Sequence, residues 1–260
     1  MGFDINEFAN EFKKTIDWML EGSHAQEIKN DLKNFENNKK NLENNPDYIE
    51  ALRMIIELIK TKGWRLRLPR NFDNKWNSFM KKHGTNFRTP EAQEELIELV
   101  GNQYIERLFE YSTLKDFTDN LYNLAKKGKT EVLGPKGRDN YLRDFGYWDR
   151  IPIDIHEKRF IIRSGIYHSC SSKQQSDPLD KDDLQDTLTT FCTEHLKECV
   201  VKKEDIGIDT DIKLCSAPGI VDIFIWSFSA QERYNICGVT PKCDECKLKG
   251  VCLYALTNSQ

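Results

Sequence analysis

The chain has 260 residues, of which 38% are hydrophobic, 31% are charged and 11% are aromatic. This length is enough for one large domain or two lobes with hydrophobic cores, and the aromatic content excludes a disordered chain. The net charge of −4 does not by itself indicate a nucleic-acid-binding protein, and the lack of a long apolar run excludes a transmembrane helix.

The first quarter of the chain predicts helices separated by a polar segment. Residues 3–21 carry Phe and Ile at helical spacing, which indicates an amphipathic helix. Residues 30–45 are rich in Asn, Lys and Glu, and they read as a loop or an exposed helix. A strong helix then begins at Pro46, keeps its Leu and Ile residues on one face, and ends at Gly63.

Helical periodicity dominates the remainder of the chain. Residues 92–111, 114–127 and 182–200 each repeat the amphipathic helical pattern. Residues 220–228 are apolar throughout and fit either a strand or a buried helix. The helix is preferred, because no other segment offers a strand partner. Residues 169–181 are the best internal candidate for a loop.

Charge is unevenly distributed along the chain. Residues 60–90 contain nine Lys or Arg and one acidic residue, with five aromatic residues between them. Residues 121–165 have a net charge of +4, and residues 166–236 have a net charge of −6. Two basic segments can present a groove to a phosphate backbone, but they are also typical of solvated helix faces with core aromatics. Charge alone leaves both interpretations open.

The strongest motif lies near the C-terminus, where four cysteines follow the pattern C-x5-C-x2-C-x5-C. Four thiols within 16 residues favour metal ligation over four independent core cysteines, because a thiolate cage needs closely spaced sulfurs. Zinc and a [4Fe–4S] cluster both accept four Cys ligands. Zinc sites usually combine two CxxC pairs and this motif has one, so the iron–sulfur cluster is preferred and zinc is the alternative. The ligands are predicted to be Cys237, Cys243, Cys246 and Cys252.

The N-terminal segment has neither a basic start nor an apolar run, so it does not read as a signal peptide. We therefore expect an intracellular protein, in the cytoplasm or nucleoid of a prokaryote or in a nucleus. In these compartments cysteines are more often thiols or metal ligands than disulfides. The remaining cysteines are expected to be core or neutral thiols: Cys170, Cys192, Cys199 and Cys215.

The C-terminal motif resembles the cluster loop in the endonuclease III and adenine-glycosylase branch of the helix-hairpin-helix DNA glycosylases. That family reads C-x6-C-x2-C-x5-C, with an aromatic residue near the last Cys. Here Tyr254 follows Cys252, and the first gap is one residue shorter. The family's loop between the first two cysteines touches DNA phosphates. The resemblance therefore implies a DNA contact for Lys242, which occupies the matching place.

A second motif upstream carries the same resemblance. The helix predicted at 114–127 leads into Gly134-Pro135-Lys136-Gly137 and a second helix, as in a helix-hairpin-helix. Bifunctional members of the family place an Asp 18 residues after the lysine, in a V/I-D-x-H context. Asp154 stands 18 residues after Lys136, within I-D-I-H. The hairpin lacks the usual L-P-G-V-G, and residues 141–147 look more like the small archaeal-type 8-oxoguanine glycosylases.

The resemblance implies a role for each residue of this pair. Lys136 would attack C1′ of the sugar and form a Schiff base, and Asp154 would stabilise the positive charge that develops on the sugar. An alternative register puts Asp139 in the lysine position and implies a monofunctional glycosylase, whereas the Lys136 register needs no gap. DNA contacts are expected from the hairpin and from a basic aromatic segment that could supply a wedge: Gly134, Gly137, Arg138, Trp64 and Arg65.

The implied fold is all-α with two lobes. Residues 48–165 would form a helical barrel with the hairpin, and residues 1–47 and 166–260 would form the lobe with the cluster loop at 237–252. The implied active site lies in the cleft between the lobes.

The implied function is base excision repair. A damaged base, expected to be oxidised, is flipped out of double-stranded DNA and removed, and AP lyase activity follows. We expect a monomer without a membrane partner. Two alternatives remain open. One is a non-enzymatic DNA-binding protein with a redox-sensing cluster, and the other is a zinc-stabilised RNA- or protein-binding module.

Overall fold

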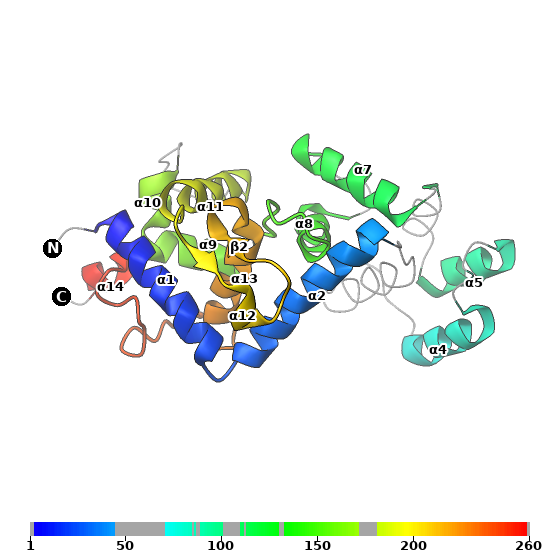
Figure 1. Ribbon diagram of the computed structural model, residues 1–260, viewed down its shortest axis with the longest axis horizontal. Helices are drawn as coiled ribbons and strands as arrows, with labels where there is room; N and C mark the ends of the chain where they lie inside the picture. The colour runs from blue at the N-terminus through cyan, green and yellow to red at the C-terminus, as the bar shows by residue number, and fades with distance from the viewer. Residues whose placement is uncertain are drawn as a thin grey trace. The chain divides into compact units, whose positions relative to one another are not determined.

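Within the residues that it describes, the computed structural model is predominantly helical (Figure 1). This confirms the all-α fold class predicted from the sequence. The sheet found in these residues has two short strands, β1 (Val200–Val201) and β2 (Ile212–Lys213), which pair antiparallel with Val200 opposite Lys213. The described residues are 3–44, 71–84, 86, 89–100, 110–111, 113–129, 133–171 and 181–258.

Two compact units make up the chain. One is formed by residues 1–37 together with residues 146–260, and the other by residues 38–145. The sequence placed the boundaries after residues 47 and 165, whereas the structure places them after residues 37 and 145. The segment with Asp154 therefore belongs to the unit that contains both ends of the chain, and not to the unit that contains Lys136.

The core of the first unit begins with helix α1 (Ile5–Glu21). Asp4 caps it by accepting a hydrogen bond from the Asn6 backbone N–H at 2.8 Å. Phe8, Phe12 and other apolar residues at helical spacing give the helix one buried face, as the sequence predicted. The Phe12 ring lies 5.5 Å from the Phe160 ring, and the Phe8 ring lies 6.0 Å from the Phe191 ring.

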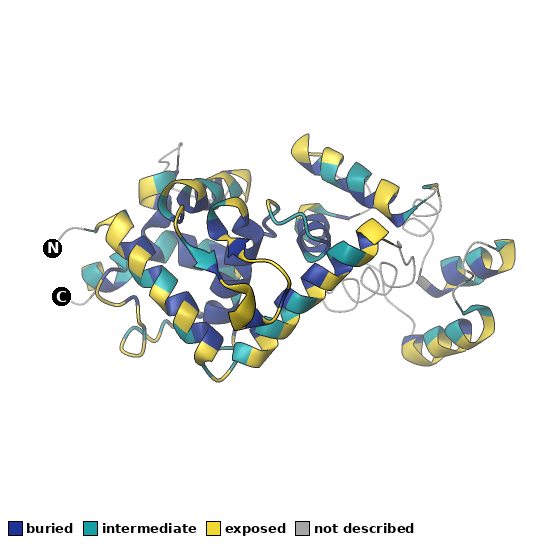
Figure 2. Cartoon of the chain, in the orientation of Figure 1, coloured by how far each residue is buried: buried dark blue, intermediate teal, exposed yellow. Residues whose placement is uncertain are grey.

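Three further helices complete this core: α9 (Ile155–Ser164), α11 (Lys181–His195) and α13 (Pro218–Ser229). Helix α13 is apolar on nearly all sides and is almost entirely buried, as the dark blue ribbon of Figure 2 shows. The helix preferred over a strand for residues 220–228 is thus confirmed. Helix α9 packs on α13, and the Phe160 and Phe228 rings meet edge to face at 6.0 Å.

Shorter or more polar elements surround the core of the first unit. Helix α2 (Ala25–Asn44) includes the Asn-rich segment, which is therefore a helix and not a loop. Helix α10 (Ile166–Cys170) follows α9 after Gly165, and helix α12 (Lys203–Ile206) lies between the two strands in sequence. The 3-10 helix η1 (Leu214–Ser216) follows β2, and helix α14 (Leu253–Asn258) follows the last cysteine.

The second unit contains two described helix pairs. Helices α4 (Phe72–His83) and α5 (Pro90–Val100) pack together, and His83 Nε2 lies 2.8 Å from Glu95 Oε2. Helices α7 (Leu114–Lys126) and α8 (Pro135–Asp144) form the other pair. Here Phe117 and Tyr141 meet edge to face at 6.0 Å between their ring centroids.

Several predicted segments lie outside the described residues. They include the helix predicted from Pro46 to Gly63, residues 101–109 of the predicted 92–111 helix, and residues 172–180 of the predicted loop. The basic segment 60–90 is described only in part, and neither Trp64 nor Arg65 is among its described residues.

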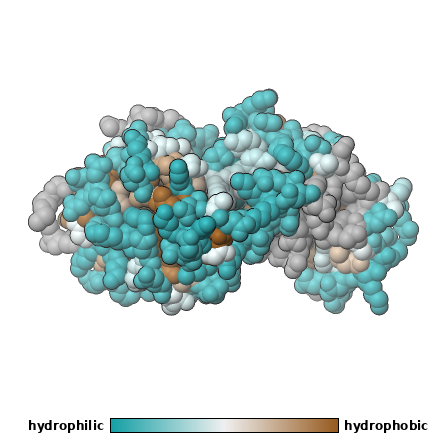
Figure 3. Space-filling model, viewed as in Figure 1, coloured by the Kyte–Doolittle hydropathy of each residue, from teal (hydrophilic) through white to brown (hydrophobic). Residues whose placement is uncertain are grey.

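The described helices carry too many polar residues, or are too short, for any of them to cross a membrane. The described surface in Figure 3 is mostly hydrophilic, with small and separate hydrophobic areas. This agrees with the high fraction of charged residues in the sequence.

Candidate functional site

The four cysteines of the C-terminal motif line one common pocket. It lies in the loop between α13 and α14, and Arg163 of α9 and Tyr254 of α14 also line it. Apolar side chains from Ile236, Pro241 and Ala255 complete the wall. In the part of the chain that the structure describes, no three Cys, His, Asp or Glu side chains converge closely enough to hold a single metal ion. The loop therefore brings the predicted ligands Cys237, Cys243, Cys246 and Cys252 to one place without closing them on one point.

Arg163 fastens this loop to helix α9. Its guanidinium donates hydrogen bonds to the carbonyl oxygens of Gly238 at 2.6 Å and Val239 at 3.1 Å. The same group lies 5.5 Å from the centre of the Tyr254 ring. In return, the Cys252 thiol donates to the Arg163 backbone carbonyl at 3.3 Å. One residue of α9 thus contacts both ends of the cysteine loop.

Burial raises the pKa of three of the four thiols. The pKa of Cys246 rises to about 12 because of burial, and burial also raises the pKa values of Cys237 and Cys252. At Cys237 the hydrogen bond and the charge of Arg163 act in the opposite direction. These three thiols are therefore protonated at neutral pH, and a metal must displace their protons to bind.

Lys242 lies in the turn between the first two cysteines. Its backbone N–H donates to the Ile236 carbonyl at 2.9 Å, and its own carbonyl accepts from the Glu245 N–H at 3.1 Å. These bonds fix the backbone of the turn, while Lys242 itself is exposed. A cation held in this way on a fixed turn is able to contact an anionic partner.

Lys136 is the second residue of helix α8 and is half-buried. Gly134 is the N-cap with extended backbone angles, and Pro135 occupies the first turn, where its missing N–H costs nothing. The positive end of the helix dipole lies at this point. Helices α7 and α8 are joined not only by packing but also by a bond of 2.9 Å between the Thr118 and Tyr141 hydroxyls.

Arg138 does not occupy the position that the sequence predicted for it. Its side chain is buried, with 4% of the residue exposed, and it forms an ion pair with Asp139 at 3.1 Å. It also donates to the Lys129 carbonyl in the segment after α7. Arg138 therefore joins the connecting segment to α8, and this burial argues against a direct contact between its guanidinium and DNA. Gly137 is also buried, within α8.

Asp154 is the N-cap of helix α9. One of its carboxylate oxygens accepts the His156 backbone N–H at 2.7 Å, and its own backbone N–H donates to Glu157 Oε2 at 2.8 Å. These reciprocal bonds form a capping box. The cap fixes the start of α9 and holds the Asp154 carboxylate at the positive end of that helix.

Glu157 was missed in the sequence, although an acid three residues after an N-cap is a recognisable signal. The residue is 1% exposed and lies beside the buried Asp222 of α13. Burial, the negative charge of Asp222 and the contact with Asp154 together hold the pKa of Glu157 well above its usual range. A second acid therefore lies directly behind the predicted catalytic carboxylate.

The four other cysteines surround helix α11. Cys192 is fully buried in the core, and Cys170 and Cys199 pack against that core. Burial raises the pKa of Cys192, and its neighbours Cys215, Cys170 and Cys199 add to this effect. Burial likewise raises the pKa of Cys170 to about 11. Their placement agrees with the prediction of core or neutral thiols, and their grouping around Cys192 was not predicted.

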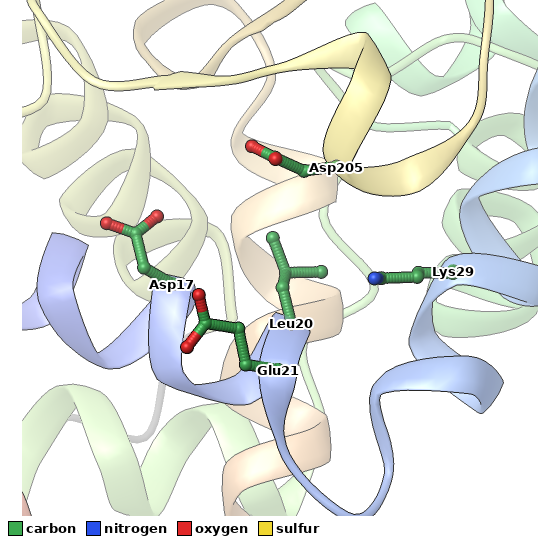
Figure 4. A pocket seen from close by; sticks show the side chains of 5 residues that line it. All are labelled: Asp17, Leu20, Glu21, Lys29 and Asp205. Atoms are coloured by element: carbon green, nitrogen blue, oxygen red, sulfur yellow. The ribbon is translucent and has the colours of Figure 1, made fainter.

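Another pocket in the first unit is open and acidic (Figure 4). It is lined by side chains of α1, α2 and α12, with three carboxylates and one lysine. None of the predicted site residues lines it. Its residues are Asp17, Leu20, Glu21, Lys29 and Asp205.

Comparisons of the chain with protein-family models, with curated proteins and with solved structures gave no match.

Proposed function

We propose that this protein is a DNA glycosylase with associated AP lyase activity, which removes a damaged, oxidised base from double-stranded DNA. The observation that carries the proposal is the pocket lined by all four cysteines of the C-x5-C-x2-C-x5-C motif. This motif resembles the cluster loop of the helix-hairpin-helix glycosylases. Lys136 and Asp154 stand upstream at the spacing that the same resemblance requires.

The residues of the pocket fit an iron–sulfur cluster. Four thiols are the donor set that a [4Fe–4S] cluster requires, and the rest of the wall is largely apolar. The Arg163 guanidinium supplies a cation beside the dianionic or more negative thiolate set. Cys237, Cys243, Cys246 and Cys252 would hold the cluster, and when bound it would cross-link the loop and stabilise its fold. Zinc remains the alternative occupant.

The surroundings of Lys136 support its role as the nucleophile. An amine must lose its proton before it attacks, and the positive end of a helix dipole disfavours the protonated form. Lys136 lies in the first turn of α8, where this dipole acts. Asp139, the residue favoured by the alternative register, is 1% exposed and paired with Arg138, which supports the Lys136 register.

The surroundings of Asp154 support its role as the charge-stabilising carboxylate. Only one of its oxygens accepts the capping bond from His156, and the residue is half-buried and not enclosed. A carboxylate held in this way can oppose the positive charge that builds on a sugar when its bond to the base breaks. The cap restricts the carboxylate to one orientation before the substrate binds.

The proposed reaction balances with these two residues. The neutral Lys136 amine forms a bond to C1′ as the bond between C1′ and the base breaks, and the base leaves with its electron pair and takes up a proton. The amine loses a proton to give the Schiff base. Loss of a C2′ proton then breaks the bond from C3′ to the phosphate oxygen, which cuts the strand and leaves an unsaturated sugar on the lysine. Hydrolysis of the Schiff base regenerates the amine.

The test is borohydride trapping on duplex oligonucleotides that each carry one lesion. Wild type should release one of the damaged bases and form a covalent protein–DNA adduct, and Lys136→Gln should form neither adduct nor cut strand, because no amine remains. Lys115→Gln is the matched control, since Lys115 is also the second residue of its helix and pairs with Asp119 at 2.6 Å. It should trap like wild type.

Two results would contradict parts of this proposal. Trapping by Lys136→Gln would show that the amine comes from another residue. Base release by wild type without any trapping would favour the monofunctional alternative, in which Asp139 takes the lysine position. If no lesion is released while DNA is still bound tightly, the protein is not a glycosylase.

A further inference from the structure

The acid behind Asp154 is buried to a degree that is unusual for a capping residue. Glu157 of α9 and Asp222 of α13 are each 1% exposed, and these two helices pack against each other. The capping box of α7 is different, because its acid, Asp116, is exposed. Two ionised carboxylates in a buried location would repel each other and lose their hydration. The location therefore favours at least one neutral acid.

The contacts between Glu157 and Asp154 identify which acid carries the proton. Glu157 Oε2 accepts the Asp154 backbone N–H at 2.8 Å, and the two side chains also share a hydrogen bond. Two carboxyl groups can share a hydrogen bond only if one is protonated. Asp154 is half-buried and accepts a helix N–H at 2.7 Å, which favours its negative charge. The proton therefore belongs to Glu157.

We propose that Glu157 is a positioning residue for Asp154, acting as a neutral acid that donates to the Asp154 carboxylate while it accepts the Asp154 backbone N–H. Held at both its backbone and its carboxylate, Asp154 keeps one orientation and carries the negative charge of the pair. This inference rests on the proposed function, because the oriented carboxylate is the group assigned to stabilise the sugar cation.

The charges around Glu157 keep it neutral across the physiological range. Burial comes first, followed by the negative charge of Asp222 on α13 and the contact with Asp154, and together they raise its pKa well above the usual value. Of the other elements packed on α9, α11 has a buried acid, Asp183, which accepts a hydrogen bond from Tyr167 of α10 at 2.8 Å. On α14, Tyr254 lies against Arg163.

Two substitutions separate a proton donor from a residue that only fills space. Glu157→Gln keeps a donor and an acceptor, so it should retain base release at neutral pH and bind DNA normally. Glu157→Met keeps the volume without the donor, and it should slow single-turnover base release by roughly 10²-fold, as for loss of an oriented hydrogen-bond donor. Asp116→Asn in the exposed capping box of α7 is the matched control, with base release expected at the wild-type rate. Wild-type base release by Glu157→Met would overturn the proposal, as would equal losses in both Glu157 variants.

The pH profile gives a readout that simple packing would not move. As the pH rises through the raised pKa of Glu157, wild type should lose the donor and gain repulsion between two carboxylates, so its base release should fall. Glu157→Gln cannot ionise and should lack this alkaline decline. Asp222→Asn removes a charge that raises the pKa of Glu157, so the decline should move to lower pH. An identical alkaline decline in wild type and Glu157→Gln would overturn the proposal.

A further measurement does not depend on activity. An acid whose pKa is raised in the folded state contributes stability that is complete below its unfolded pKa, about 4.3, and is lost as the pH rises through its folded pKa. The unfolding free energy of wild type should therefore fall relative to that of Glu157→Gln as the pH rises. The carbon-13 carboxyl signal of Glu157, assigned by its absence from Glu157→Gln, should show a neutral acid at pH 7. An ionised signal at pH 7 would overturn this inference even if base release is found. A neutral signal without any base release would instead refute the proposed function.

Discussion

The single residue that combines most of the proposed chemistry is Asp154. It caps α9 through a bond of 2.7 Å from the His156 N–H, and Glu157 contacts it from the buried side. A cap alone contributes about 1 kcal/mol to stability, and an Asn at the N-cap performs that task nearly as well as an Asp. Replacing the carboxylate by an amide therefore separates the two roles of Asp154.

We expect Asp154→Asn to slow base release by about 10²-fold or more while the protein stays folded and binds DNA, because the lost charge acts mainly in the transition state. Single-turnover kinetics on the preferred lesion measures this. Asp4→Asn is the matched control, since Asp4 caps α1 with the same geometry at 2.8 Å. Equal rates for the two variants would show that Asp154 is a cap and nothing more.

Residue identity alone predicted the cysteines better than it predicted the basic residues. The four cysteines of the motif are close in sequence, so any compact loop brings them near one another. Arg138 follows a Gly-Pro-Lys-Gly turn and reads as a phosphate contact, but its partners are Asp139 and a backbone carbonyl, which no sequence pattern reports. Glu157 was missed for a related reason, because its burial depends on α13, which is distant in the sequence.

At the scale of elements, the cysteine loop depends on ligands and on Arg163 for its shape. We expect Cys246→Ala to lose most of its iron and sulfide and to lower the melting temperature, because the energy of ligation is energy of folding. Cys215→Ala, at a cysteine outside the motif, is the control and should retain the metal. Metal analysis and visible absorption measure the outcome. Full iron retention by Cys246→Ala would contradict the assigned ligand set.

The junction between α9 and α10 gives an independent prediction about stability. Gly165 has a φ of +96°, and a Cβ at this position would lie 2.6 Å from the Phe3 ring. We expect Gly165→Ala to lower the free energy of unfolding by about 1–3 kcal/mol, from the backbone strain and the displaced ring.

Two other glycines separate these causes. Gly128→Ala has a φ of +64° and open space around the added methyl group, so it reports the backbone cost alone. Gly250→Ala has open space without a positive φ and should be close to neutral. Calorimetry of the three variants checks the order. A Gly165→Ala protein as stable as Gly250→Ala would contradict the packing of Phe3.

The long periodic elements were predictable and the short ones were not. Helix α1 repeats its aromatic residues at helical spacing, and α13 is too apolar for an exposed strand, so both followed from pattern. Strands β1 and β2 have two residues each and exist only because Val200 pairs with Lys213 across an intervening helix. Two residues carry no measurable periodicity, so this pairing could not be seen in the sequence.

At the scale of the whole molecule, a net charge of −4 requires that any DNA contact come from local clusters of basic residues. We expect binding to weaken steeply with salt, and Lys242→Gln to lower affinity on all sequences and to reduce the salt slope by about one. Lys197→Gln is the control, because Lys197 is exposed but lies in the acidic segment 166–236. Fluorescence anisotropy at several salt concentrations measures both. An unchanged slope for Lys242→Gln would remove the cysteine loop from the DNA interface.

The discontinuous first unit has a consequence for how the chain folds during synthesis. Residues 1–37 belong with residues 146–260, so α1 leaves the ribosome long before the partners of Phe8 and Phe12, which lie on α9 and α11. The whole of the second unit is translated in between. Until then α1 keeps an apolar face in contact with water, where chaperones bind. Closing that long chain segment is also slow compared with forming local helix pairs such as α7 and α8. The nascent protein should therefore become protease-resistant first in the middle of its sequence, and α1 should gain protection only when synthesis is almost complete.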